Sequence, residues 1–299
     1  MGQLARAFAT AEPFRHVVID DFLAADFCAK LSAEFPPFSA KHALDEHGEV
    51  GGKAAIPNIA ELGPAYRRFD ALMSDSAFLG LMGQIAGIDA LLYDPAYIGG
   101  GTHENLEGQE LDLHVDFNYH PKTLLHRRLN LIVFLNPEWQ ESWGGCLELC
   151  RDPWDASGGA APVVPLANRA VLFETTESSW HGFNRIELPE DKRHLSRRSI
   201  AVYFYTRERE ARETAPSHAT IYIPRPLPPH LQPGYTLQPA DIEELHRLTE
   251  RRNMLIRFLY EREKEFGETM AHVSGITRSR TFLLARILTW PVRKLRGTT

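Results

Sequence analysis

Leu111-Asp112-Leu113-His114-Val115-Asp116-Phe117 is the stretch that decides the fold of this 299-residue chain. It is a short apolar run between polar residues, which predicts a β-strand. Residues i and i+2 of a strand point to the same face, so the imidazole of His114 and the carboxylate of Asp116 are expected on one face. Asn118 and Pro121 follow, and both residue types favour turns. The pair is therefore expected at the rim of a sheet.

Six more short apolar runs are separated from this one and from each other by turn-forming residues. They cover 91–98, 129–135, 146–149, 163–165, 170–173 and 199–205. A succession of this kind predicts a mainly β fold, a sandwich or a barrel. The span from the first run to the last has the length of an eight-stranded jelly roll.

This pattern divides the chain into three parts. Residues 1–90 carry a predicted strand at 14–20 and supporting helices at 25–35 and 66–82. Residues 91–207 carry the β core, and residues 208–299 form a Pro-rich linker and a C-terminal helical extension. The last helix is expected to begin near Pro239, because proline suits the first helical turn.

An apolar stripe follows this last helix and consists of Leu245, Leu248, Leu255, Phe258, Leu259 and Phe266. The stripe is expected to pack against the β core or a partner subunit. The alternative is the seam of a coiled-coil homodimer, which Arg252 and Arg262 disfavour.

The segment 278–296 combines basic and apolar residues and contains no acidic residue. A basic amphipathic segment with a tryptophan, here Trp290, can lie on an anionic membrane surface. Peripheral contact with the inner face of a membrane is therefore one hypothesis for the tail, and a solvated helix or one that covers its own protein is the other.

Composition excludes several classes of protein. The formal net charge of −6 argues against nucleic-acid binding by the whole chain. The three cysteines, Cys28, Cys146 and Cys150, have no framework spacing, which is typical of a reduced cytoplasmic setting. The sequence contains neither 18 uninterrupted apolar residues nor the apolar run of a signal peptide, so a cytoplasmic location is expected.

A third metal ligand can be assigned to a distant run. His181 lies in Ser179-Trp180-His181-Gly182-Phe183. Two histidines and one carboxylate on one side of a metal leave its other side open, which is the facial triad of non-heme Fe(II) oxygenases. Because the chain has 13 histidines, a lone His-x-Asp triplet is weak support, and the assignment depends on further features.

The run Arg197-Arg198-Ser199-Ile200-Ala201-Val202-Tyr203-Phe204-Tyr205 supplies such a feature. Residues 197, 199 and 201 share one face of the strand, and two of them are small. A buried arginine that faces a cavity needs an anion, and its planar guanidinium suits a carboxylate. A dicarboxylate held by the metal at one end and by Arg197 at the other would satisfy both observations. Arg198 is the runner-up and is expected on the opposite face.

Taken together, the motifs of this sequence resemble those of the iron(II)/2-oxoglutarate-dependent oxygenases, in the branch that contains prolyl 4-hydroxylases. The resemblance covers 14–205. Its motifs are Ile19-Asp20-Asp21-Phe22-Leu23, Tyr97-Ile98-Gly99-Gly100-Gly101, His114-Val115-Asp116, the run 131–139, Trp143-Gly144-Gly145-Cys146-Leu147-Glu148-Leu149, Trp180-His181-Gly182 and the Arg197 strand.

The resemblance implies a double-stranded β-helix, which is a jelly roll with a metal at one mouth. It implies that His114, Asp116 and His181 bind Fe(II), that Arg197 binds the distal carboxylate of 2-oxoglutarate, and that Tyr97 contacts this cosubstrate. The implied reaction uses O2, with ascorbate as reductant, to hydroxylate an unactivated C–H bond.

One position departs from the prolyl hydroxylase pattern. Many of these enzymes have a tyrosine where this chain has Phe134, and its hydroxyl contacts the cosubstrate carboxylate. Asn130 lies four residues earlier on the same face and is expected to replace that hydrogen bond. Trp143, Gly144 and Gly145 are interpreted as residues of a tight turn.

The sequence is compatible with two classes of substrate. A protein residue such as proline is the default by resemblance, and a sugar of a glycan or lipopolysaccharide is the second class. Polar residues expected near the mouth, as candidates for substrate contacts, are His103, Glu104, Asn105, Asp112, Asn118 and Tyr119. Two other functions compete: a zinc hydrolase, which gives the Arg197 strand no role, and a non-enzymatic, cupin-like module that binds metal or sugar.

Overall fold

The structure, a computed structural model, describes residues 2–43, 54–155, 162–228, 230–279, 281, 282 and 284. The chain divides into two compact units, Met1–Ile223 and Pro224–Thr299. The described strands all belong to the first unit, and the described part of the second is built around one long helix.

Two antiparallel sheets make up the core of the first unit. The larger has the order β1 (His16–Ile19), β8 (Ala170–Glu174), β6 (His126–Phe134), β10 (Arg197–Thr206), β4 (Gly101–Asn105) and β2 (Ala54–Ile56), and β3 (Leu92–Tyr93) also pairs with β10. The smaller has the order β11 (Ile221–Ile223), β5 (Leu111–Val115), β9 (Trp180–Phe183) and β7 (Leu147–Cys150). This is the predicted double-stranded β-helix.

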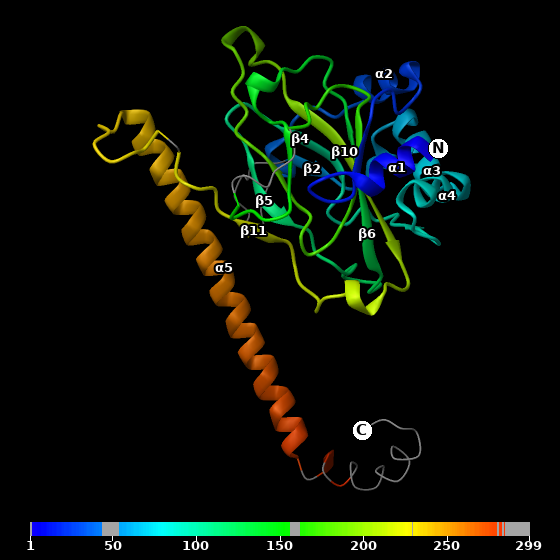
Figure 1. Ribbon diagram of the computed structural model, residues 1–299, viewed down its shortest axis with the longest axis vertical. Coiled ribbons are helices and arrows are strands. Elements are labelled where there is room, and N and C mark those ends of the chain that lie inside the picture. The colour runs from blue at the N-terminus through cyan, green and yellow to red at the C-terminus, as the bar shows by residue number, and fades with distance from the viewer. Residues whose placement is uncertain are drawn as a thin grey trace. The chain divides into compact units, whose positions relative to one another are not determined.

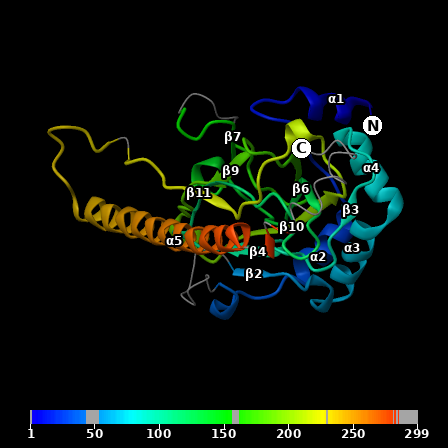
Figure 2. The same cartoon turned by 90° about the horizontal axis from the view of Figure 1, so that it is seen from below.

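Four helices cover the outer face of the larger sheet, on the side away from β5, β9 and β11 (Figures 1 and 2). They are α1 (Gly2–Thr10), α2 (Ala25–Ala33), α3 (Pro64–Ser74) and α4 (Ser76–Ala86). Successive residues of each strand in the larger sheet therefore point alternately toward the helices and toward the interior. On β6, Leu129, Leu131 and Val133 pack toward the helices, whereas Asn130 and Ile132 face the interior between the sheets.

The sequence predicted one helix over 66–82, and the structure has two. Asp75 separates α3 from α4, and its carboxylate accepts hydrogen bonds from the backbone N–H groups of Ala77 and Phe78. An aspartate in this position is an N-cap, which starts a new helix. The run 91–98 is also shorter than predicted, because only Leu92–Tyr93 is a strand and a turn follows.

The boundary between the two units falls after Ile223 and not after residue 207. Residues 208–223 end in β11, which pairs with β5 and extends the smaller sheet. Residues 1–90 do not stand apart either, since β1 and β2 belong to the larger sheet.

The second unit contains α5 (Pro239–Arg278), which begins at the predicted proline. Gln238 and Asp241 form a capping box at its start. No helix in the described residues is both long and apolar enough to cross a membrane. The basic tail proposed as a membrane contact lies mostly outside the described residues, at 280, 283 and 285–299.

Candidate metal centre

Strand pairing brings the two predicted histidine ligands together. His114 on β5 and His181 on β9 are register partners in the smaller sheet. Residues directly opposite in an antiparallel pair have neighbouring side chains on the same face. The two rings are accordingly 4.2 Å apart between centroids, and both side chains are buried. Asp116 follows β5 directly, two residues after His114, on the same face.

The three side chains form a cluster that can hold a metal ion. One nitrogen or oxygen from each residue lies within 4.8 Å of the others. Asp116 Oδ1 is 3.8 Å from His114 Nε2, and Asp116 Oδ2 is 3.5 Å from His181 Nε2. Two ligands that each bind an ion at about 2.1 Å lie at most about 4.2 Å apart, so the two distances from Asp116 suit a shared ion, and any pair near the 4.8 Å limit would move closer on binding.

Backbone hydrogen bonds orient both imidazoles. His114 Nδ1 is 2.9 Å from the carbonyl oxygen of Asp112, and His181 Nδ1 is 3.1 Å from that of Ser179. A carbonyl oxygen accepts, so each ring carries its proton on Nδ1. The Nε2 lone pairs are then directed to the centre, as metal-binding histidines require.

Asp116 is held by a buried arginine that the sequence analysis did not single out. Arg127 Nη2 donates to Asp116 Oδ2 over 2.8 Å, and its side chain is completely buried. The guanidinium lies over the ring of Tyr203, with 3.4 Å from Cζ to the centroid, and 4.5 Å from that of Phe117. Burial acts to lower the pKa of Arg127, but the attraction of Asp116 and neighbouring tyrosines raises it overall. Arg127 therefore stays charged.

Arg127 carries the same sequence signature as Arg197. In both places an Arg-Arg pair opens an apolar strand, and the first arginine turns inward. Arg128 faces other carboxylates, Glu174 at 3.7 Å and Glu213 at 3.9 Å. Strict alternation would place Arg127 with Leu129 toward the helices, and a register shift between β6 and β10 accompanies its inward turn, so the sequence pattern alone does not select it.

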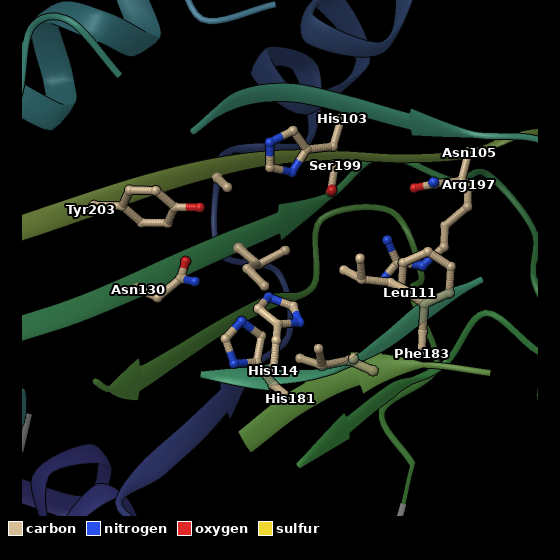
Figure 3. A pocket seen from close by; sticks show the side chains of 14 residues that line it. His103, Asn105, Leu111, His114, Asn130, His181, Phe183, Arg197, Ser199 and Tyr203 are labelled. Carbon is tan, nitrogen blue, oxygen red and sulfur yellow. The ribbon is translucent and has the colours of Figure 1, made fainter. Parts of the chain in front are cut away.

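A pocket of about 50 Å³ lies between the two sheets and reaches from the histidines to Arg197 (Figure 3). Arg197, Asn105, Leu111 and Phe183 lie at one end of it, and Asn130 and Tyr203 lie at the other. Register explains this division, since Arg197 pairs with Asn105 and Tyr203 pairs with Asn130.

Arg197 is a buried cation that no carboxylate of the described residues neutralises. Its Nε donates to the carbonyl oxygen of Gly145 over 2.6 Å, and its Cζ lies 4.1 Å from the ring centroid of Phe183 and 5.2 Å from that of Phe134. Burial lowers the pKa of Arg197 to about 9. An anion bound in the pocket would reverse that shift, so the site is suited to a carboxylate.

Arg198 points out of the pocket, as the alternation of the strand requires. Its Nε is 3.1 Å from Glu104 Oε1. Glu104 thus faces away from the pocket with it, whereas its neighbours His103 and Asn105 line the pocket. Asn118 and Tyr119 donate to the backbone of Pro216 and Ala215.

Tyr97 does not line the pocket. The carboxylate of Asp94 accepts from the N–H groups of Ala96 and Ile98 and closes a turn, in which Tyr97 has a φ of 46°. Its ring consequently packs edge-on against Tyr93, 5.6 Å away, in the core beneath the helices. The contact of Tyr97 with the cosubstrate was expected from the resemblance alone, and the ring is not among the residues that line the pocket.

Asn130 lines the pocket, but at the metal end. Four residues correspond to about 13 Å along a strand, which separates Asn130 from Phe134 and from Arg197. Its Nδ2 is 3.5 Å from Asp116 Oδ2, so it contacts the ligand carboxylate. The hydroxyl in register with Phe134 is that of Ser199, which lines the pocket two residues after Arg197.

Comparison with known proteins identifies the β core. Residues 101–205 match the family model described as the 2OG-Fe(II) oxygenase superfamily, and this segment contains the three candidate ligands and Arg197. Residues 101–205 form a 2OG-Fe(II) oxygenase domain. No curated protein matches the chain.

Several solved structures are similar to the chain. A prolyl hydroxylase from Trichoplax adhaerens, in complex with a peptide fragment, is 13% identical, with coverage of 68% of this chain and 88% of that chain and a TM-score of 0.47. A prolyl-4-hydroxylase from Pseudomonas putida is 18% identical, with coverage of 69% and 100% and a TM-score of 0.41. HygX from Streptomyces hygroscopicus, with nickel, 2-oxoglutarate and hygromycin B bound, is 13% identical, with coverage of 72% and 93% and a TM-score of 0.48.

The residues of the oxygenase domain fit both cofactors. Two Nε2 atoms and one carboxylate on neighbouring strands are the donor set of a non-heme Fe(II) site. A buried guanidinium at the far end of the same pocket fits the second carboxylate of 2-oxoglutarate. His114, Asp116 and His181 would hold the metal, and Arg197, with the nearby Ser199, would hold the cosubstrate.

Proposed function

We propose that this protein hydroxylates an unactivated C–H bond of an organic substrate at the His114–Asp116–His181 centre, with 2-oxoglutarate anchored on Arg197. When bound, Fe(II), 2-oxoglutarate and O2 supply the oxidant, and succinate, CO2 and the hydroxylated substrate are the products. The observation that carries the proposal is the pocket that joins the three ligands to a buried arginine without a carboxylate partner in the described residues.

The protein contributes orientation and a dry cavity. The carbonyl groups of Asp112 and Ser179 keep both imidazole Nε2 atoms directed at the metal position. Arg127 fixes one oxygen of Asp116 and leaves its other oxygen directed at His114. The apolar side chains of Leu111, Ile132, Leu147 and Phe183 line the pocket and limit the access of water.

For the substrate we propose a residue in a protein, with proline first, as the resemblance of the sequence motifs to prolyl 4-hydroxylases implies. A sugar of a glycan or lipopolysaccharide is the competing class. Tyr222 on β11 lies beside the centre, with its ring 5.0 Å from that of His114, and is 40% exposed. Part of its ring is therefore exposed beside the centre, at the outer edge of the smaller sheet.

The test measures succinate in air with Fe(II), 2-oxoglutarate and ascorbate, against a set of proline-containing peptides and a set of oligosaccharides. Mass spectrometry then looks for a gain of one oxygen atom. If a peptide gains oxygen, the proposal is supported. If only a saccharide gains oxygen, the substrate is a sugar and not a protein residue. Asp116→Ala serves as the control, because it removes a ligand. If the intact protein binds Fe(II) and 2-oxoglutarate but forms no succinate, the proposed activity is wrong and the binding module gains support.

A further inference from the structure

The helix α5 presents an apolar stripe that the oxygenase chemistry does not use. Several large side chains on it are about half or more exposed, with Ile256 at 63%, Leu259 at 62% and Phe266 at 60%. The stripe consists of Ile242, Leu245, Thr249, Arg252, Ile256, Leu259, Glu263, Phe266, Met270 and Val273. The set shares Leu245, Leu259 and Phe266 with the stripe expected from the sequence, and Leu248, which is buried, lies at its edge beside Leu245 and Arg252.

The spacing of the stripe is that of a coiled coil. Its members alternate in steps of four and three residues from Ile242 to Val273, the a and d positions of a heptad repeat. The repeat extends over more than four heptads, or about 47 Å of helix. That length is sufficient for a stable seam.

Two charged residues interrupt the stripe, and they determine how a second helix can pair with it. In a parallel pair in register, Arg252 would face Arg252 of the second copy, and Glu263 would face Glu263. In an antiparallel pair in which residue numbers of opposing positions add up to 515, Arg252 faces Glu263. The same alignment places Ile256 opposite Leu259, Thr249 opposite Phe266, and Ile242 opposite Val273.

No neighbouring antiparallel alignment satisfies the charges. A shift by one heptad in either direction places Arg252 opposite Ile256 or Met270. It also places Glu263 opposite Leu245 or Leu259. Each shift therefore buries both charges against apolar side chains. In the described residues, Arg252 and Glu263 have no ion-pair partner within the chain, whereas Arg257 pairs with Glu261 and Arg262 with Glu265.

We propose that α5 is the interface of a homodimer, in which two copies of the chain pair through an antiparallel coiled coil. The occupant of the stripe is a second copy of the same helix. The two Arg252–Glu263 contacts fix its direction and alignment, and the apolar layers supply the affinity. The pair that argues against a parallel seam thus becomes the determinant of an antiparallel one.

Charge reversal in the full-length chain tests the alignment. Sedimentation or light scattering should give twice the 33.8 kDa mass of one chain. Arg252→Glu alone and Glu263→Arg alone each place like charges opposite one another and should raise the dimer dissociation constant by about tenfold or more. The double variant, Arg252→Glu with Glu263→Arg, should restore it to about the original value. Single reversals without effect, or a double variant weaker than both, would overturn the proposal.

Disulfide capture gives an independent test that does not depend on affinity. Ile242→Cys together with Val273→Cys should form a covalent dimer under oxidation. Ile242→Cys alone should not, because the two copies of residue 242 would be about 47 Å apart and a disulfide needs Cα atoms within about 7 Å. The native cysteines are buried. A covalent dimer from the single variant would indicate a parallel pair and would contradict the proposal. The proposal is also wrong if the protein is a monomer at all concentrations, or if it is a monomer that sediments with anionic vesicles.

Discussion

At the scale of single residues, the centre depends on a cation that does not touch the metal position. Arg127 is fully buried and its only described carboxylate partner is Asp116. A carboxylate ligand can rotate, and a fixed hydrogen bond to one oxygen selects the orientation in which the other oxygen meets an ion. Arg127 is thus a positioning residue for the ligand set.

Replacement of Arg127 should weaken metal binding. We expect Arg127→Met to reduce the affinity for Fe(II), or for Mn(II) as a redox-stable substitute, by about 10- to 100-fold, as calorimetry can measure. Arg128→Met is the matched control, since Arg128 faces Glu174 and not the centre. If both variants bind metal as the unchanged protein does, Arg127 has no role in positioning Asp116.

Arg197 should make cosubstrate binding sensitive to alkaline pH. The pKa of Arg197 is lowered to about 9, so its charge is complete at neutral pH and is lost as the pH rises through 9. The dissociation constant of 2-oxoglutarate should therefore rise by up to about tenfold per pH unit above this value. Arg197→Gln should raise it by about 100-fold at pH 7.5 and remove the pH dependence. Arg198→Gln should leave both unchanged, and a pH profile shared by all three proteins would exclude Arg197 as the anchor.

Ser199 and Asn130 should have separate effects, because they lie at opposite ends of the pocket. Ser199→Ala removes a hydroxyl near Arg197 and should weaken 2-oxoglutarate binding by about three- to tenfold, with metal affinity unchanged. Asn130→Ala removes a contact to Asp116 and should weaken metal binding instead. Titrations with metal and with 2-oxoglutarate distinguish the two variants. If Asn130→Ala weakens 2-oxoglutarate binding more than metal binding, Asn130 contacts the cosubstrate, as the sequence predicts.

At the scale of elements, a turn before β7 supports the Arg197 side chain. Gly145 has a φ of 65°, and a Cβ there would lie 3.0 Å from Ile186 and 3.3 Å from Cδ of Arg197. Its carbonyl oxygen also accepts from Arg197 Nε. The Gly144-Gly145 pair is therefore a turn, as the sequence predicts, and also part of the wall around the anchor.

Gly145→Ala should destabilise the fold by about 1–3 kcal/mol and weaken 2-oxoglutarate binding, because strain and crowding displace Arg197. Gly80→Ala in α4 is the control. No atom lies within 4 Å of its added Cβ, and the change should stabilise the helix by about 0.5–1 kcal/mol. Thermal unfolding and a 2-oxoglutarate titration measure both. Equal behaviour of the two variants would contradict the turn's role.

The sequence predicted the strands and the ligand set better than the surroundings of the ligands. Short apolar runs between turn-forming residues located β5, β6 and β10, and the i, i+2 rule placed His114 with Asp116 and Arg197 with Ser199. Contacts that depend on turns were less predictable. The Asp94 turn moved Tyr97 away from the pocket, and the partnership of Arg127 with Asp116 needs the pairing of distant strands.

At the scale of the whole molecule, the first unit contains every candidate ligand and its own core. A chain that ends at Ile223 should therefore fold, bind metal and be monomeric. A chain that ends at residue 207 lacks β11, leaves the strand of His114 at the sheet edge, and should unfold at a lower temperature. Thermal unfolding and sedimentation compare the two. A stable 1–207 chain would show that β11 is dispensable.

The register of His114 with His181 has a consequence for the life of the protein in a cell. An ion bound there would link strands that lie 67 positions apart in the sequence, as a covalent bridge would. Because the unfolded chain cannot hold the ion in this way, metal binding adds to the stability of the folded state by mass action. Iron scarcity should then lower the abundance of the protein as well as its activity, since the metal-free form unfolds and is degraded more readily.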